Sequence, residues 1–184
     1  DLAWSRGLGD VYKRQVMIVT TRRSLVGGNS SARVRTLPVE LIEQENQPIG
    51  VVLLDSGSEL VIVGADGRAD RYARDGSAYV FAETTALTDE AQSVTVVTPL
   101  LGRNTILVGT DDGQVLTWML TREGTDEGGS RSLVRVKEFR IADQPVTRIS
   151  TSQRDRTFIA ADAGGTIRLW HATSGKLVGE AQAD

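Results

Sequence analysis

The chain has 184 residues, of which 40% are hydrophobic and 24% charged, with a formal net charge of −3 and no cysteine. This composition is typical of a globular domain, and it excludes disulfides, thiolate metal sites and the basic surface expected of a nucleic-acid-binding protein. No apolar run approaches the roughly 20 residues that a membrane-spanning helix needs. The sequence shows no signal peptide and does not begin with methionine, so we expect it to be an internal piece of a longer protein.

The N-terminal segment predicts a leader followed by two strands. Residues 1–15 (DLAWSRGLGDVYKRQ) differ in style from the remainder. They are similar to adaptor-derived translations at the ends of metagenomic reading frames, so we interpret them as a non-native leader. The alternative is a genuine terminal segment anchored by Trp4. Residues 16–20 form a β-branched run and residues 33–37 alternate, which predicts two strands. We interpret residues 16–38 as the outer half of an incomplete unit of the type that follows.

A unit of four short strands then occurs three times, over residues 47–83, 93–140 and 145–180. In each unit, apolar or alternating runs are separated by turn residues such as Gly, Asp, Asn and Ser. The predicted strands are residues 49–54, 60–64, 69–72 and 79–82 in the first unit, 94–98, 106–109, 115–120 and 133–139 in the second, and 146–150, 157–161, 166–170 and 177–179 in the third.

Each unit has a glycine five residues before a large aromatic residue. The three motifs are LVIVGADGRADRY (60–72), ILVGTDDGQVLTW (106–118) and FIAADAGGTIRLW (158–170). Repeats of this length that are built from short strands are typical of β-propellers. No segment has the apolar spacing of a helix, and an immunoglobulin-like sandwich does not account for the repeated offset. The sequence therefore predicts an all-β fold, a partial β-propeller of three four-stranded antiparallel blades with a partial N-terminal blade.

The end of the second unit predicts an edge strand and a long loop. In residues 133–139, two valines alternate with an arginine and a lysine, which is typical of an edge strand with one solvent-facing side. The preceding residues 123–130 (EGTDEGGS) are acidic and rich in glycine. This composition predicts an exposed hairpin loop that could contact a partner.

The polar residues that could carry chemistry are better explained by turns. His171, the only histidine, directly follows the aromatic residue of the third motif. That position favours a role at a strand end over that of a general base or a metal ligand. Asp66, Asp111 and Asp112 lie beside turn glycines, where Asp-Gly is a common hairpin signal, so we do not assign them to calcium. We expect Asp162 to hydrogen-bond within a neighbouring turn rather than to act as a catalytic acid.

Neither the glycine pairs nor the loop arginines predict a nucleotide or phosphate site. Gly27-Gly28 and Gly164-Gly165 lack the Gly-x-Gly-x-x-Gly spacing, and no helix is predicted after them. The arginines considered are Arg22, Arg23, Arg154 and Arg156. Arginines of this kind could attract phosphate, but on loops they are more often solvated surface. We therefore predict no catalytic, cofactor-binding or metal-binding residues, no cofactor and no enzymatic activity.

Residues 161–178 (ADAGGTIRLWHATSGKLV) resemble the second turn, third strand and following turn of a WD40 repeat. His171 and Met119 stand where that repeat usually has an aspartate after the tryptophan, and no Gly-His pair precedes the units. We therefore expect the blades to rely on packing of Tyr72, Trp118 and Trp170 more than on the hydrogen-bond network of typical repeats.

A narrower resemblance covers most of the chain after residue 51. Residues 107–123, 134–140 and 145–178 are similar to the propeller-like region of long proteobacterial phosphate ABC transporter permeases. In those proteins a soluble domain is inserted after the first transmembrane helix. The resemblance implies a non-catalytic domain on the periplasmic side of the bacterial inner membrane, attached through parts of the protein that are not in this chain.

The same resemblance implies protein partners, either transporter subunits or a solute-binding protein, and a role in these contacts or in shaping access to the permease. No nucleic-acid partner is expected. The alternative is a free-standing, cytoplasmic WD40-like scaffold for protein interactions. A transmembrane helix upstream of this region, with several downstream, would distinguish the two interpretations.

Overall fold

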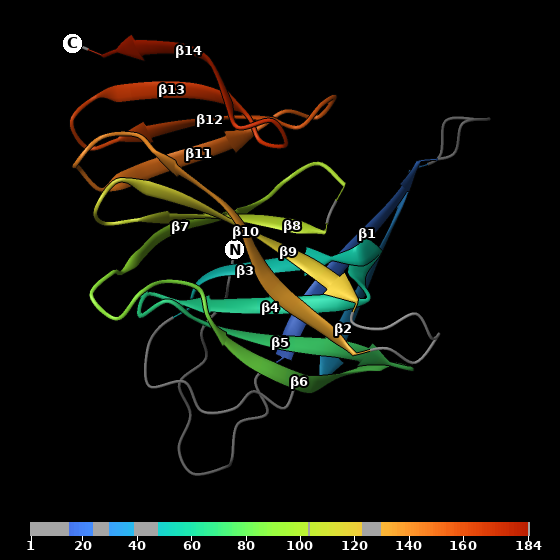
Figure 1. The fold of residues 1–184 in the computed structure, drawn as a ribbon. Helices are drawn as coiled ribbons and strands as arrows, with labels where there is room; N and C mark the ends of the chain where they lie inside the picture. Colours follow the sequence, from blue (N-terminus) through green and yellow to red (C-terminus); the bar gives the residue numbers. More distant parts are fainter. Residues whose placement is uncertain (1–14, 24–29, 39–47, 103, 123–129, 184) are drawn as a thin grey trace, which may run out of the picture.

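The structure is a computed structural model that describes residues 15–23, 30–38, 48–102, 104–122 and 130–183. Its strands form three four-stranded antiparallel sheets and one two-stranded sheet (Figure 1). The only other regular element in the described residues is a short 3-10 turn, η1 (Asp55–Gly57). No helix in this part of the chain could span a membrane. The predicted all-β fold class is confirmed.

The three large sheets are meanders in which the strands lie in chain order. Every strand predicted for the three units falls within one observed strand. The first sheet contains β3 (Pro48–Leu54), β4 (Glu59–Gly64), β5 (Arg68–Asp75) and β6 (Ala78–Ala86). The second contains β7 (Val94–Pro99), β8 (Thr105–Thr110), β9 (Gln114–Arg122) and β10 (Arg131–Arg140). The third contains β11 (Val146–Thr151), β12 (Thr157–Asp162), β13 (Thr166–His171) and β14 (Lys176–Gln182).

The two N-terminal strands form a sheet of their own. β1 (Gln15–Arg23) pairs antiparallel with β2 (Ser30–Pro38), and β2 lies against β6 of the first large sheet. Both predicted strands are therefore present, while their interpretation as the outer half of a further blade stays a prediction. The predicted leader lies outside the described residues except for its last residue, Gln15. Residues 123–129 of the predicted acidic loop also lie outside them.

The first strands of the three blades lie side by side, β3 next to β7 and β7 next to β11. Figure 1 shows the three sheets following one another, with β6, β10 and β14 at their outer edges. Each inner strand contains a register shift at the same place, at Ile49, Thr95 and Thr147. The Thr95 hydroxyl lies 2.6 Å from the Val146 carbonyl oxygen, so the shifted residue of the second blade connects it to the third.

The glycine of each repeated motif lies in the turn between the second and third strands. Its φ is +81° at Gly67, +85° at Gly113 and +83° at Gly165, in a region that other residues adopt only with strain. In each blade the glycine carbonyl oxygen accepts a hydrogen bond of 2.8 to 2.9 Å from a backbone N–H just after the fourth strand. The donors are Leu87, Ile141 and Ala183. The glycine therefore closes one turn and fixes the end of the outer strand.

The three motif aromatic residues are buried and face the same way around the propeller. Trp118 packs in the core between the first and second sheets. Trp170 packs between the second and third, with ring centroids 5.4 Å from Phe158 and 5.6 Å from Phe139. Tyr72 lies on the side of the first sheet away from the second. Trp118 and Trp170 therefore face the preceding blade, and Tyr72 lies on the corresponding side of the first sheet.

On the second strand of each blade, the residue next to the one that pairs with the motif aromatic points to the opposite face, towards the following blade. Val61 packs between the first and second sheets, Leu107 packs between the second and third, and both are 0% exposed. Ile159 occupies the same register position in the third sheet and is 41% exposed. The difference arises because no described sheet follows the third one.

The edge strand β10 was predicted correctly, but its two valines do not form a buried side. Val134 and Val136 are exposed. The Arg135 guanidinium pairs with Glu138 at 2.7 Å, and Lys137 donates to the Thr173 carbonyl oxygen of the third blade at 2.7 Å. A register shift between Arg135 and Lys137 places these two side chains on opposite faces of the sheet, Arg135 opposite Trp118 and Lys137 opposite Thr117, so the simple alternation expected from the sequence is broken.

We expect Leu107→Ala to lower the free energy of unfolding by about 2–5 kcal/mol, because it leaves a cavity between two sheets. Ile159→Ala removes similar atoms at the equivalent position and should cost roughly 1 kcal/mol or less, since that side chain is already half solvated. Equilibrium urea unfolding of both variants measures the difference. Equal losses would show that the outer side of the third sheet is also covered.

The turn glycine should tolerate no side chain. In Gly113→Ala the new Cβ would lie 2.1 Å from the Ala142 carbonyl oxygen, at a φ of +85°. Gly76→Ala is the matched control, because its φ is +55° and nothing lies within 4 Å of the new Cβ. We expect the control to cost about 1–2 kcal/mol from backbone strain alone. Gly113→Ala should unfold at a clearly lower urea concentration, and similar midpoints would contradict the close packing of this turn.

Candidate functional site

A chain of charged side chains connects the first sheet to the start of β10. Arg71 on β5 is only 5% exposed and pairs with Glu59 and Glu83, each at 2.7 Å. It also donates to the Arg131 carbonyl oxygen at 2.5 Å. The Arg131 guanidinium in turn contacts Asp55 at 2.5 Å and Glu59 at 3.2 Å. The buried charges are therefore paired, as burial in a low dielectric requires.

Asp55 lies in a strained turn between β3 and β4. The φ values are +44° at Asp55, +57° at Ser56 and +89° at Gly57, so two residues other than glycine occupy the left-handed region. Ser58 donates to Asp55 through its hydroxyl, at 2.9 Å from Oδ2, and through its N–H, at 3.1 Å from the carbonyl oxygen. The Tyr79 hydroxyl donates to the Gly57 carbonyl oxygen at 2.6 Å. These bonds hold the Asp55 carboxylate in place, and strain of this kind is often found at functional sites.

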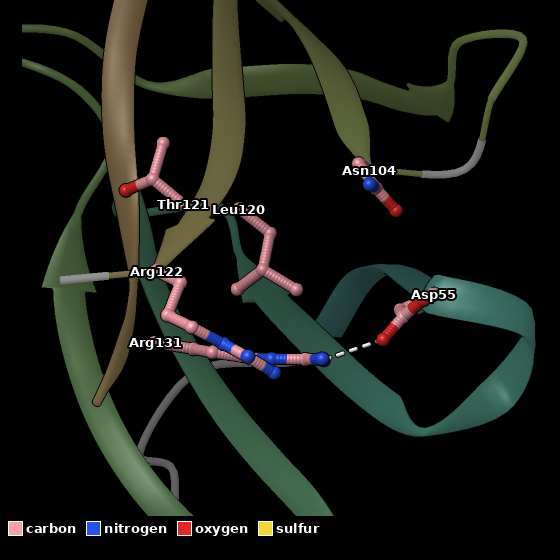
Figure 2. Close-up of a pocket in the computed structure, with 6 residues that line it drawn as sticks. All are labelled: Asp55, Asn104, Leu120, Thr121, Arg122 and Arg131. Carbon is pink, nitrogen blue, oxygen red and sulfur yellow. Dashed lines mark hydrogen bonds and ion pairs between the residues drawn. The ribbon is translucent and has the colours of Figure 1, made fainter. Parts of the chain in front are cut away.

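A small cavity of about 170 Å³ opens beside this network. Its lining residues are Asp55, Asn104, Leu120, Thr121, Arg122 and Arg131. Figure 2 shows the side chains of Arg122 and Arg131 extending in the same direction, with the Arg131 guanidinium reaching Asp55. Arg122 ends β9, and no ion pair joins it to any other residue that the structure describes. We define these six residues as the rim cavity.

Asp55 and Arg131 stabilise each other's charged form. The hydrogen bond from Arg131 lowers the pKa of Asp55 below its ordinary value of 3.8, with smaller contributions from Ser58 and from the charge of Arg122. The same hydrogen bond to Asp55 raises the pKa of Arg131. Asp55 and Arg131 are therefore both charged at neutral pH.

Because folding lowers the pKa of Asp55, its contribution to stability should be present above the unfolded pKa of about 3.9 and be lost as the pH falls through the lower folded pKa. Asp55→Asn removes the charge but keeps a residue that tolerates positive φ. We expect the free energy of unfolding of the variant to be lower than that of the wild type by up to about 1 kcal/mol at pH 7. This difference should become smaller as the pH falls towards 3. Urea unfolding of both proteins across this pH range measures the difference in free energy of unfolding, and a difference that does not change with pH would contradict the ionic contribution.

His171 and Asp162 lie in the turns that flank β13. His171 is the last residue of that strand, its Nδ1 lies 3.1 Å from the Ser174 hydroxyl oxygen, and it accepts a hydrogen bond from the Ser174 N–H at 3.3 Å. Asp162 Oδ1 accepts a hydrogen bond from the Thr166 N–H at 2.8 Å, while the buried Oδ2 has no partner among the described atoms. These positions match the turn roles that the sequence predicts.

The turn aspartates accept hydrogen bonds within or beside their own turns. The donors are Arg68 N–H to Asp66, Ser93 N–H to Asp111, and the side chains of Gln92, Thr110 and Gln114 to Asp112. Burial raises the pKa of Asp112, but these three side-chain bonds and the charge of Arg140 outweigh it and leave the pKa lowered. No group of three or more His, Cys, Asp or Glu side chains that could hold a metal ion occurs in the described ranges.

The other arginines from the sequence analysis do not join the rim cavity. Arg154 and Arg156 are exposed between β11 and β12. Arg22 and Arg23 belong to β1, but their side chains lie outside the described structure, as does the Gly27-Gly28 pair. Gly164-Gly165 forms the turn between β12 and β13.

Sequence reasoning missed the rim cavity altogether. One signal was available, because Arg122 and Arg131 flank the predicted hairpin loop and antiparallel pairing places the two ends of such a loop opposite each other. The contribution of Asp55 could not be inferred in this way. It comes from a turn of the preceding blade and meets Arg131 only through packing of the blades.

Comparison with known proteins supports the fold and leaves the function open. No protein-family model and no curated protein matches the sequence. The β-propeller domain of Cps50 (Swd1) from Myceliophteria thermophila is similar, with a TM-score of 0.62 and 14% identity over 94% of this chain and 54% of its own. The WD40 repeats of RRP9 give a TM-score of 0.60 and 8% identity over 78% of this chain and 41% of theirs. The fold is a WD40-like β-propeller.

A third similar structure is the periplasmic gluconolactonase PpgL of Pseudomonas aeruginosa, with a TM-score of 0.59 and 15% identity over 80% of this chain and 41% of its own. The chain thus spans about half, or less, of the length of these propellers. At such low identity the likeness concerns the fold alone. Because one neighbour is named as an enzyme and another by its WD40 repeats, function has to be argued from the sites on the propeller.

Proposed function

We propose that this chain is a non-enzymatic protein-interaction module in which a rigid WD40-like propeller presents its turns and loops to partner proteins. The observation that carries this proposal is the rim cavity. It is built from a turn and from strand ends at the boundary of two blades, and it combines fixed charges with Arg122, which has no ion-pair partner in the described ranges. Binding groups held on loops by a rigid scaffold are a common arrangement in interaction proteins.

We further propose that the module belongs to a bacterial phosphate ABC transporter permease and lies on the periplasmic side of the inner membrane. The resemblance of residues 107–123 and 145–178 to the inserted region of such permeases supports this assignment. The partner would be a solute-binding protein or another transporter subunit. The domain would not be the primary phosphate site, since the exposed Arg154 and Arg156 form no basic cluster with Arg122 and Arg131.

A free-standing cytoplasmic scaffold is the second candidate. The similarity to propellers with WD40 repeats supports it, because this fold commonly serves protein assembly. It requires no membrane-anchored host. The two candidates share the interaction role and differ in where the module is placed and which partner it contacts.

The transporter proposal can be tested with the full-length gene. The domain is deleted, its flanking segments are rejoined by a short flexible linker, and uptake of radiolabelled phosphate is measured together with the amount of permease in the membrane. We expect lower uptake at an unchanged permease level, because a contact that supports transport has been removed. A variant with only the exposed Arg154→Ala change is the control and should transport normally. Unchanged uptake in the deletion strain at all phosphate concentrations would overturn the transporter proposal in favour of the scaffold.

A further inference from the structure

The rim cavity holds two arginines side by side on neighbouring strands, an arrangement that favours binding of an anion. Arg122 and Arg131 are direct cross-strand partners in the β9–β10 pair. Side chains at such positions lie on the same face with Cβ atoms roughly 5 Å apart, and like charges there repel each other. Asp55 and Glu59 offset the charge of Arg131. No carboxylate in the described ranges forms an ion pair with Arg122, whose charge acts on Asp55 only at longer range.

The cavity also supplies the donors that a carboxylate needs. Arg131 contacts Asp55, Ser58 and Glu59 through Nη1 alone. The Arg122 guanidinium has no hydrogen-bond partner in the described structure. A free guanidinium can bind a carboxylate with two parallel hydrogen bonds. The Asn104 side chain lies at the opposite wall of the cavity, and Leu120 adds an apolar surface.

Charge and size restrict the ligand. Arg71, Arg122 and Arg131 together balance Asp55, Glu59 and Glu83, so the network with its cavity is neutral before any ligand binds. A single negative charge disturbs this balance less than the two charges of a phosphate monoester. The volume of about 170 Å³ is also smaller than the roughly 300–1,000 Å³ of cavities for drug-sized ligands. The cavity therefore fits one side chain rather than a nucleotide or a sugar phosphate.

We propose that the rim cavity receives one aspartate or glutamate side chain of a partner protein, with Arg122 as the residue that binds its carboxylate. This inference rests on the proposed interaction function and names the chemistry that the partner must present. Asp55 has a positioning role, because it pairs with Arg131, while Arg122 has no ion-pair partner among the residues that the structure describes. The strained turn that carries Asp55 keeps this arrangement ready before the partner arrives.

The test uses the whole chain and two short peptides, acetyl-Gly-Glu-Gly-amide and its glutamine counterpart. Binding is followed by NMR through the arginine Nε–H signals, with the Arg122 signal assigned from its absence in Arg122→Gln. We expect the glutamate peptide to shift the Arg122 signal along a saturating curve. The glutamine peptide should bind at least about tenfold more weakly, because it lacks the charge.

Two variants serve as controls. Arg122→Gln should weaken binding of the glutamate peptide about tenfold or more, whereas Arg154→Gln, on an exposed loop outside the cavity, should leave it unchanged. Both positions are exposed, and circular dichroism checks that both variants fold. The same Arg122 signal also reports binding of inorganic phosphate.

The inference is overturned if the glutamate peptide fails to saturate, if Arg122→Gln and Arg154→Gln behave alike, or if inorganic phosphate binds more tightly than the glutamate peptide. These results would leave the proposed function standing, since that is tested by phosphate uptake of the deletion strain. Conversely, unchanged uptake with saturable binding of the glutamate peptide would reject the transporter role and keep the carboxylate site.

Discussion

The structure depends on the packing of one face of each sheet against the next. Along a strand, alternate residues point to opposite faces, so in the second blade Ile106 faces the first sheet and Leu107 faces the third. Both faces of that blade are apolar, and neither could be buried without its neighbours. The same alternation brings Trp118 and Trp170 each onto the preceding blade. The second blade therefore needs a sheet on each of its faces to bury its apolar side chains.

The turn glycines give each blade the same backbone geometry, so the same packing recurs from blade to blade. Because Gly67, Gly113 and Gly165 adopt nearly the same positive φ, the following strand leaves each turn in the same direction. The aromatic residue five positions later then pairs with the equivalent residue of the second strand in every blade, as in Ile106 with Trp118. A shared backbone geometry, rather than identical side chains, keeps the blades equivalent. This explains how the fold tolerates His171 and Met119 at positions where a typical WD40 repeat has an aspartate.

The rim cavity exists because two blades meet there. Arg71 and Glu59 belong to the first sheet, Arg131 belongs to the second, and the desolvation of Arg71 is compensated only when all three are in place. Removing one partner of such a buried pair typically costs several kcal/mol, about 3–5 in measured cases. The network thus fixes the start of β10 relative to the turn at Asp55. The proposed carboxylate site lies at this boundary, beside the first sheet's buried ion pairs.

The sequence by itself determined the strands, their grouping into blades and the turn roles of His171 and Asp162. These features depend on local periodicity and on turn residues, which can be recognised within a short stretch of sequence. It also indicated β10 as an edge strand. What only the tertiary structure decided was the exposure of both valines of β10 and the contact of Asp55 with Arg131. The first depends on a register shift in the pairing of β9 with β10, and the second joins residues 76 positions apart. Contacts of that kind are set by how the sheets pack, and no local pattern records them.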